Sequence, residues 1–259
     1  MPTVTSDDHT LAARLATEAG RLLLHLRAST VREVGRAGAV NGRALGRAGD
    51  RQAHELLMTG LAEARPDDAV LSEEGVADPA RLRAPRVWIV DPLDGTREYG
   101  EVPRTDWAVH VALVVEGEPV AGAVALPGRD LTLGTRPAPA APPGGDGVPR
   151  IVVSRSRPPA EAALVADALG GELMPLGSAG AKTMAVVLGE ADLYVHNGGQ
   201  YEWDSAAPVA VARAAGLHAS RLDGSPLVYN RPDPYLPDLL VCRPELADAA
   251  IAAATAAHG

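Results

Sequence analysis

The chain has 259 residues, of which 46% are hydrophobic and 22% charged, and these values are typical of a folded globular protein rather than a disordered one. Acidic residues outnumber basic residues by 33 to 24, so the net charge of −9 argues against a surface that binds nucleic acid. There is no basic and apolar leader at the start and no apolar run of about 18 residues, so we expect a cytoplasmic protein with no membrane partner.

The first half of the chain reads as two helices followed by strands. Apolar spacing predicts helices over residues 8–28 and 50–64, and short apolar runs predict strands at 69–71, 87–90, 107–115 and 120–125. The segment Glu116-Gly117-Glu118 between the last two strands is a hairpin signal. Residues 35–49 are rich in Gly and Arg without an apolar period, so we interpret them as a mobile loop. That loop is either a solvated connection or a lid over the site.

A second half follows a linker rich in Pro and Gly at residues 136–149. Strands are predicted at 151–154, 174–176, 191–195, 219 and 238–241, and helices at 159–169, 179–188 and 205–215. The apolar neighbours of Cys242, the single cysteine, predict that it is buried, and one cysteine excludes an intramolecular disulfide. We therefore expect an α/β fold of two halves, residues 1–135 and 150–259, that meet at a cleft.

The most informative motif is Asp91-Pro92-Leu93-Asp94-Gly95-Thr96, which follows a short apolar strand. Pro92 fixes its own φ and Gly95 allows a bend, so the two aspartates can face one point. Two close carboxylates repel unless a cation lies between them, and oxygen ligands such as these, with the Leu93 carbonyl, suit Mg²⁺. The residues from Thr96 begin a helix or turn whose N–H groups can hold a phosphate. The alternative is an ordinary Asx turn at a strand end, with no ion.

Other acidic residues strengthen the interpretation as a metal site. Glu73 and Glu74 follow a short strand, and Asp204 precedes an apolar helix, where by itself it is more typical of an N-cap. Asp50 similarly opens the second predicted helix. Several carboxylates at the ends of strands and loops, together with the aspartate motif, predict a phosphatase that uses more than one metal ion.

Three segments resemble the signatures of the inositol monophosphatase superfamily in order and spacing: Ser72-Glu73-Glu74, Asp91–Thr96 and Trp203-Asp204-Ser205-Ala206-Ala207. The run Gly95-Thr96-Arg97-Glu98-Tyr99 is similar to the form found in its CysQ-type branch, the adenosine 3′,5′-bisphosphate phosphatases. Ser154–Arg157 and Gly177–Lys182 also resemble that branch. The resemblance implies a layered αβαβα sandwich with a shared metal cleft. It also implies a lithium-sensitive enzyme of sulfur assimilation that removes the 3′-phosphate of adenosine 3′,5′-bisphosphate (PAP), or of its sulfated form PAPS, by direct attack of water.

The same resemblance implies a role for each matching residue. Two or three Mg²⁺ ions would be held by Glu73, Asp91, the Leu93 carbonyl, Asp94 and Asp204. Asp50 and Thr96, with Glu73, would be the catalytic residues, and the first two would orient the attacking water. Gly95 and Thr96 would hold the phosphate through their N–H groups. The remaining substrate contacts would come from Arg97, Arg155, Ser178 and Lys182, the last of which is the chain's single lysine.

Three alternatives remain at this point. A phosphatase of the same superfamily could act on inositol 1-phosphate or fructose 1,6-bisphosphate, and a sensor could bind phosphate esters without catalysis. A covalent route of the haloacid dehalogenase kind needs the motif D-x-D-x-T, whereas two residues separate Asp91 from Asp94. The partner in each case is a small phosphate ester. The sequence leaves open whether the protein is a monomer or a homodimer.

Overall fold

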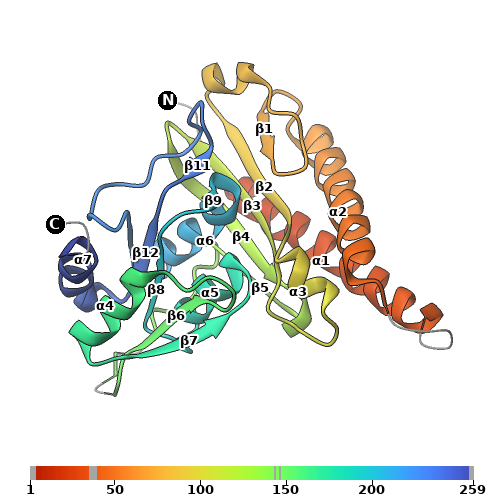
Figure 1. Ribbon diagram of the computed structural model, residues 1–259. Coiled ribbons are helices and arrows are strands. Elements are labelled where there is room, and N and C mark those ends of the chain that lie inside the picture. Colours follow the sequence, from red (N-terminus) through yellow and green to blue (C-terminus); the bar gives the residue numbers. More distant parts are fainter. Residues whose placement is uncertain (1–3, 35–39, 143, 146, 257–259) are drawn as a thin grey trace.

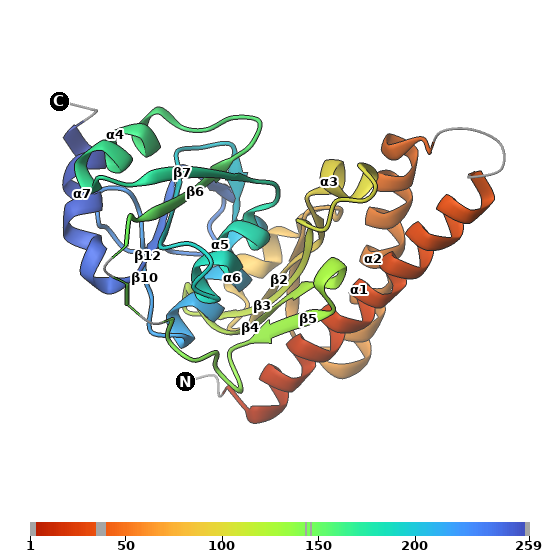
Figure 2. The ribbon, with the colours of Figure 1, turned by 90° about the horizontal axis from the view of Figure 1, so that it is seen from below.

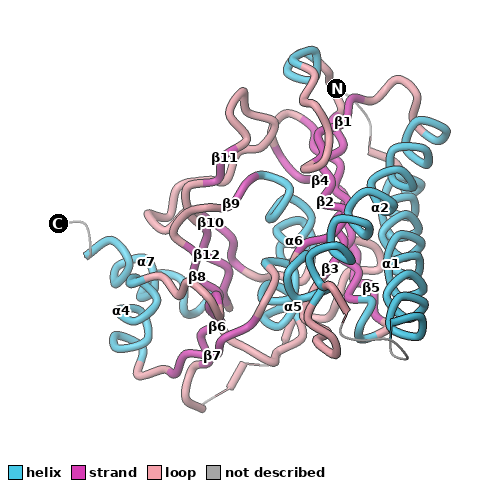
Figure 3. The backbone as a smooth tube through the Cα atoms, turned by 45° about the vertical axis from the view of Figure 1, so that its right-hand side comes forward, coloured by secondary structure: helices cyan, strands magenta, loops and turns pink. Residues whose placement is uncertain are grey.

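The structure is a computed structural model that describes residues 4–34, 40–142, 144–145 and 147–256. Its elements stack in five layers, α-β-α-β-α, which confirms the predicted fold class (Figure 1). The three helical layers are seen edge-on in Figure 2 and in cyan in Figure 3. They are formed by α1 (Ser6–Val34) with α2 (Gly42–Ala64), by α5 (Ala179–Val187) with α6 (Glu202–Ala214), and by α4 (Ala160–Leu169) with α7 (Ala247–Thr255).

The first sheet has the strand order β1-β2-β3-β4-β5. Its strands are β1 (Ala69–Ser72), β2 (Val87–Asp94), β3 (Ala108–Val115), β4 (Glu118–Leu126) and β5 (Leu131–Gly134). β1 runs parallel to β2, and the other pairs are antiparallel. The predicted hairpin is confirmed, because Val115 pairs with Glu118 and the two loop residues, Glu116 and Gly117, have φ of 52° and 82°. Positive φ at both positions is the geometry of a tight hairpin whose twist matches that of its strands.

The second sheet is mixed and has the strand order β10-β12-β8-β6-β7. Its strands are β6 (Arg150–Ser154), β7 (Glu172–Leu176), β8 (Leu193–His196), β10 (His218–Ser220) and β12 (Leu239–Cys242). A short ribbon pairs β9 (Gln200–Tyr201) with β11 (Tyr235–Leu236). In the described part of the chain, four short helices complete the fold: α3 (Thr96–Gly100), η1 (Pro79–Arg83), η2 (Pro127–Arg129) and η3 (Pro244–Leu246).

Alternating side chains of each strand fill separate cores on the two faces of its sheet. Trp88 and Val90 of β2 pack toward α1 and α2, whereas Val87 and Ile89 pack toward the central helices. The central core reaches the inner face of the second sheet, and a third core covers its outer face under α4 and α7. Cys242 is buried in this third core, as predicted. The aspartate motif at the end of β2 thus lies between two packed layers, which hold it rigidly.

The prediction of a mobile loop at residues 35–49 is wrong for residues 42–49. Residues 42–49 are the first two turns of α2, and residues 35–39 lie outside the described residues. The glycines serve close packing here rather than flexibility. A Cβ atom at Gly42 would lie 2.5 Å from the carbonyl oxygen of Gly100, and one at Gly46 would lie 2.6 Å from Cγ2 of Thr96. Glycine therefore lets α2 lie directly against α3, beside the aspartate motif.

Candidate active site

A β-bulge brings the two aspartates of the motif to the same side of the sheet. Along a regular strand, residues three apart point to opposite faces. In β2, however, Asp91 pairs with His110 and Asp94 pairs with Ala108, so β2 holds one residue more than β3 between these pairs. Pro92 explains the irregularity, because it has no N–H to donate to the ladder. The strand was predicted to end at Val90, but the bulge lets it continue to Asp94.

Asp204 completes a cluster with these two aspartates. One carboxylate oxygen each of Asp91, Asp94 and Asp204 lie within 4.8 Å of one another. α6 begins at Glu202, so Asp204 lies in its first turn and is not the residue before the helix. Its Oδ2 accepts a hydrogen bond of 2.7 Å from the N–H of Tyr201, which orients the carboxylate. Residues more than a hundred positions apart in sequence therefore converge at one point.

The acidic residues of this cluster repel one another in a largely buried environment, and this repulsion shifts their pKa values. Burial and the charges of Glu73 and Asp94 raise the pKa of Asp91 well above its usual value. Burial and the charge of Asp94 raise the pKa of Asp204 to about 7. Glu73 follows β1 and is an exposed residue, but loss of hydration around its carboxyl group, with repulsion from Asp50 and Asp94, raises its pKa to about 7. Such a set of acids is favourable when cations lie among them, and its oxygen donors suit a hard divalent ion.

Asp94 differs from its neighbours because it is surrounded by donors. The N–H groups of Ala179 and Gly180, at the start of α5, donate to its two oxygens at 3.1 and 2.6 Å. Nε2 of His110 lies 3.2 Å from Oδ2. Although burial acts in the opposite direction, His110 and these N–H groups lower the pKa of Asp94. Asp94 therefore carries its negative charge before any ion binds.

His110 is a site residue that the sequence analysis missed. It is fully buried in β3, and its Nδ1 lies 3.0 Å from the backbone oxygen of Trp203, next to Asp204. The signal was present in the sequence, because His110 interrupts the otherwise apolar run Ala108–Val115. A buried polar side chain in such a run needs a partner. Only the pairing of β2 with β3 shows that the partner is Asp94.

Thr96 connects the cluster to Asp50. Its hydroxyl lies 3.3 Å from Oδ1 of Asp50 and 3.1 Å from the carbonyl oxygen of Leu93, and its single proton can serve one of them at a time. Asp50 does not open a helix as predicted, but lies inside α2 on the buried face. Burial and the charge of Glu74 raise its pKa to about 7. A carboxyl group with this pKa can accept a proton near neutral pH.

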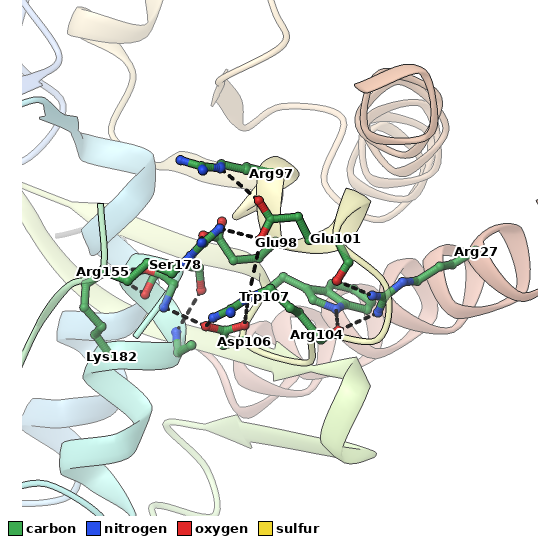
Figure 4. Close-up of polar contacts among 12 residues, drawn as sticks. Arg27, Arg97, Glu98, Glu101, Arg104, Asp106, Trp107, Arg155, Ser178 and Lys182 are labelled. Carbon is green, nitrogen blue, oxygen red and sulfur yellow. Dashed lines mark hydrogen bonds and ion pairs between the residues drawn. The ribbon is translucent and has the colours of Figure 1, made fainter. Parts of the chain in front are cut away.

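The predicted substrate contacts are largely engaged with other protein groups. Arg155 donates to Glu98 at 2.7 Å and to Glu101 at 2.8 Å, while Arg97 pairs with Glu101 at 3.0 Å (Figure 4). Ser178 accepts from the N–H of Ala181 and so caps α5.

The predicted contact Lys182 is buried, and its ammonium donates to the carbonyl oxygens of Gly177 and Ser178. The lone lysine therefore holds together the turn that precedes α5. Roles of Arg97, Arg155, Ser178 and Lys182 in substrate binding stay predictions.

Comparison with known proteins identifies the family. Residues 6–137 and 149–259 match the Inositol monophosphatase family. This chain belongs to the inositol monophosphatase family. It is 52% identical over 252 residues to the 3′-phosphoadenosine 5′-phosphate phosphatase of Mycobacterium leprae, covering 93% of this chain and 90% of the relative. It is 34% identical over 209 residues to the 3′(2′),5′-bisphosphate nucleotidase CysQ of Escherichia coli, covering 73% and 81%.

A solved structure shows the same architecture in this inositol monophosphatase family. CysQ from Bacteroides thetaiotaomicron superposes with a TM-score of 0.73 at 28% identity, covering 92% of this chain and 97% of that protein. With these relatives and the convergent acidic cluster, the chain is a phosphoric monoester hydrolase. Among the described residues, no helix combines the length and apolar character needed to cross a membrane.

Proposed function

We propose that this enzyme removes the 3′-phosphate of PAP, and by the same chemistry that of PAPS, in a Mg²⁺-dependent hydrolysis. The observation that carries the proposal is the convergence of Asp91, Asp94 and Asp204, within 4.8 Å of one another, in a chain 52% identical to a 3′-phosphoadenosine 5′-phosphate phosphatase. In PAP, the bond between phosphorus and the 3′-oxygen breaks, a bond from water oxygen to phosphorus forms, and the leaving 3′-oxygen takes up a proton from solvent. The products are adenosine 5′-monophosphate (AMP) and phosphate. Because the enzyme removes PAP, it acts in sulfur assimilation in this proposal. Its proposed location is the cytoplasm.

The residues present fit a magnesium site. Glu73, Asp91, Asp94, Asp204 and the Leu93 carbonyl supply oxygen donors only, and the raised pKa values of Glu73, Asp91 and Asp204 indicate charge that needs compensation. Two or three bound Mg²⁺ ions would supply this compensation, lower the pKa of a water molecule and stabilise charge on the leaving oxygen. We assign these five residues to the ions.

Asp50 and Thr96 position the attacking water in this proposal. The Thr96 hydroxyl can donate to Asp50 and at the same time accept a hydrogen bond from water. The proton that water loses passes through this hydroxyl to the Asp50 carboxylate, whose pKa of about 7 suits that task. The N–H groups of Gly95 and Thr96, at the first turn of α3, hold the phosphate oxygens. We keep Glu73 as a third catalytic residue because it faces the same acids.

A comparison of substrates tests the proposal. Mg²⁺-dependent kcat/KM is measured on PAP, inositol 1-phosphate and fructose 1,6-bisphosphate, with Asp94→Asn as the inactive variant. Asp223→Asn, which changes an aspartate in an exposed turn, is the matched control. We expect PAP to be preferred and Asp94→Asn to lose activity. Equal phosphate release by wild type and Asp94→Asn would contradict the assignment, and a preference for inositol 1-phosphate would replace the substrate.

The division of labour between the two halves is part of the proposal. Residues 1–135 supply Asp50, Glu73 and the aspartate motif, and residues 150–259 supply Asp204. The substrate is a small phosphate ester, without a nucleic acid or membrane partner. The protein acts as a monomer or a homodimer, which light scattering at assay concentration distinguishes.

A further inference from the structure

A loop in the second half of the chain, residues 228–234, connects the start of α6 with the segment between β1 and β2. The loop leads into β11, which pairs with β9 just before α6 (Figure 1). On its other side lies η1, which packs against β1. β1 leads directly to Glu73, whose N–H donates to the carbonyl oxygen of Val90 at 3.4 Å. The loop thus links an element beside Glu73 to the helix that carries Asp204.

The carboxylate of Glu202, in the first turn of α6, is held by two consecutive N–H groups of this loop. The N–H groups of Asn230 and Arg231 donate to its two oxygens at 2.7 and 2.8 Å. Asn230 has a φ of 58°, which asparagine adopts more readily than most residues, and this conformation turns successive N–H groups toward one acceptor. The N–H of Glu202 itself donates to the carbonyl oxygen of Pro234 at 2.8 Å. Both the side chain and the backbone of Glu202 are therefore bound to the loop.

Arg81, a buried arginine of η1, holds the opposite side of the same loop. Its Nη1 donates to Oδ1 of Asn230 at 2.6 Å, and its Nη2 donates to the carbonyl oxygen of Arg231 at 2.8 Å. The Asn230 amide returns a hydrogen bond of 3.1 Å to the carbonyl oxygen of Arg81. A cation therefore binds acceptors of these two loop residues, while the Glu202 carboxylate binds their N–H donors. Hydrogen bonds to charged groups are stronger than those between neutral groups, so the loop is held firmly between the two halves.

Burial of both charged groups is costly, so their presence needs a reason other than stability. Arg81 is 3% exposed and Glu202 is 1% exposed, and well-packed apolar side chains often stabilise a fold as well as buried ions do. The two charged groups add a defined geometry, since each hydrogen bond has a preferred direction. That geometry is imposed on the first turn of α6, the turn in which Asp204 lies.

We propose that Glu202 and Arg81 are positioning residues that hold Asp204 in the geometry for Mg²⁺ binding. The inference rests on the proposed assignment of Asp204, with Asp91 and Asp94, to Mg²⁺. Asp204 comes from a different half of the chain than the other two aspartates, so its place among them depends on how the start of α6 is anchored. Mg²⁺ tolerates little variation in the positions of its ligands, so a small shift of the helix start weakens its binding.

Mg²⁺ binding to the metal-free protein, measured by calorimetry at neutral pH, tests the proposal. Glu202→Gln keeps the size of the side chain but places an amide donor against one of the two N–H groups. We expect it to raise the Mg²⁺ dissociation constant about ten- to a hundredfold, the range for residues that orient metal ligands. Arg81→Met removes the guanidinium and should act in the same direction. Glu63→Gln and Arg83→Met, at exposed positions of α2 and η1, are the matched controls and should leave Mg²⁺ binding unchanged.

Two substitutions at Asn230 separate its contact with Arg81 from its backbone conformation. Asn230→Gly removes the side-chain acceptor of Arg81, while glycine adopts the positive φ without strain and keeps the N–H that donates to Glu202. Asn230→Asp restores an acceptor for Arg81 and should therefore bind Mg²⁺ more tightly than Asn230→Gly. On PAP, Asn230→Gly and Glu202→Gln should need more Mg²⁺ for the half-maximal rate, while kcat at saturating Mg²⁺ stays close to that of the wild type.

A purely structural role of Glu202 and Arg81 predicts a different result. The variants would then melt at lower temperature in EDTA, yet bind Mg²⁺ as the wild type does and gain the same increase in melting temperature when Mg²⁺ is added. That outcome would overturn the proposal, as would a lower kcat with unchanged Mg²⁺ affinity. Should Arg81→Met fail to fold, Glu202→Gln and Asn230→Gly decide the question.

Failure of the proposal can be distinguished from failure of the proposed function. A wild type that binds no Mg²⁺ would overturn the positioning role together with the metal assignment. A wild type that binds Mg²⁺ but does not hydrolyse PAP would overturn the proposed substrate alone. The Mg²⁺ dissociation constants of the variants would then still decide the role of Glu202 and Arg81.

Discussion

Nε2 of His110 lies 3.2 Å from Oδ2 of Asp94, while its Nδ1 lies 3.0 Å from the backbone oxygen of Trp203. Since a carbonyl oxygen only accepts, Nδ1 carries a proton, and the carboxylate at the other nitrogen favours a second one. The charge of Asp94 raises the pKa of His110 although burial opposes this. The buried His110 side chain thus links β2 and β3 to the first turn of α6, where Asp204 lies.

Replacement of this histidine should destabilise the protein. His110→Leu leaves the buried Asp94 carboxylate without the imidazole beside it, and we expect the free energy of unfolding to fall by about 3 kcal/mol. Urea denaturation measures the change. His25→Leu, at an exposed position of α1, should shift it by less than about 0.5 kcal/mol. Equal effects of the two substitutions would show that the buried pair contributes nothing.

The stability of the metal-free protein should fall as pH rises from about 4 to about 7. Asp50, Glu73 and Asp204 have pKa values of about 7 in the fold, against ordinary values of 3.8 to 4.5. Between these two ranges of pKa the folded chain therefore keeps protons that the unfolded chain releases. The resulting stabilisation of the folded state is complete below about pH 4 and is lost by about pH 7. Melting temperatures in EDTA at pH 5 and pH 8 measure this, with Mg²⁺ restoring stability at pH 8. A metal-free protein with a higher melting temperature at pH 8 than at pH 5 would contradict the raised pKa values of these acids.

Loss of the Thr96 hydroxyl should reduce turnover. Thr96→Val keeps the shape of the side chain but cannot pass a proton to Asp50, so we expect kcat on PAP to fall about 10²–10⁴-fold. Thr96→Ser keeps the hydroxyl and is the matched variant, with activity close to wild type. Steady-state phosphate release measures both. Similar kcat values for the valine and serine variants would remove Thr96 from the proton path.

Substitution of Gly46 should separate α2 from α3. Gly46→Ala places a methyl group 2.6 Å from Cγ2 of Thr96, and we expect a cost of about 1–3 kcal/mol in stability together with lower kcat. Gly147→Ala, where an added Cβ atom meets nothing within 4 Å, is the control. Gly46→Pro should break α2 rather than stiffen a loop. A Gly46→Ala variant as stable and active as Gly147→Ala would show that the contact can relax.

Lithium should inhibit the enzyme. The carboxylates of Asp91, Asp94 and Asp204 crowd within 4.8 Å and need divalent charge, whereas Li⁺ in a Mg²⁺ position supplies a single charge. We expect activity on PAP to fall at Li⁺ concentrations of roughly tens of millimolar, an order-of-magnitude choice. The same concentration of NaCl is the control for ionic strength. Full activity in Li⁺ would indicate a different ion site.

The sequence by itself determined the parts that depend on local pattern. Short apolar runs predicted strands at 107–115 and 120–125, close to the observed Ala108–Val115 and Glu118–Leu126, and the segment Glu116-Gly117-Glu118 predicted their hairpin. The aspartate motif and the segment around Asp204 indicated a phosphatase, because several carboxylates lie at the ends of strands and loops and because these segments resemble the signatures of the family. These signals depend on residues that are close together in the sequence, so they can be recognised without the fold.

Tertiary structure decided everything that depends on which elements lie side by side. In the sequence, Gly42 and Gly46 indicate a flexible loop. In the structure they lie in α2, because α3 packs against them and stabilises the start of that helix. His110 gains a role only when β3 pairs with β2, and the bulge at Pro92 decides that Asp91 and Asp94 face one point. A site formed by residues distant in sequence depends on long-range packing, and no local pattern contains that information.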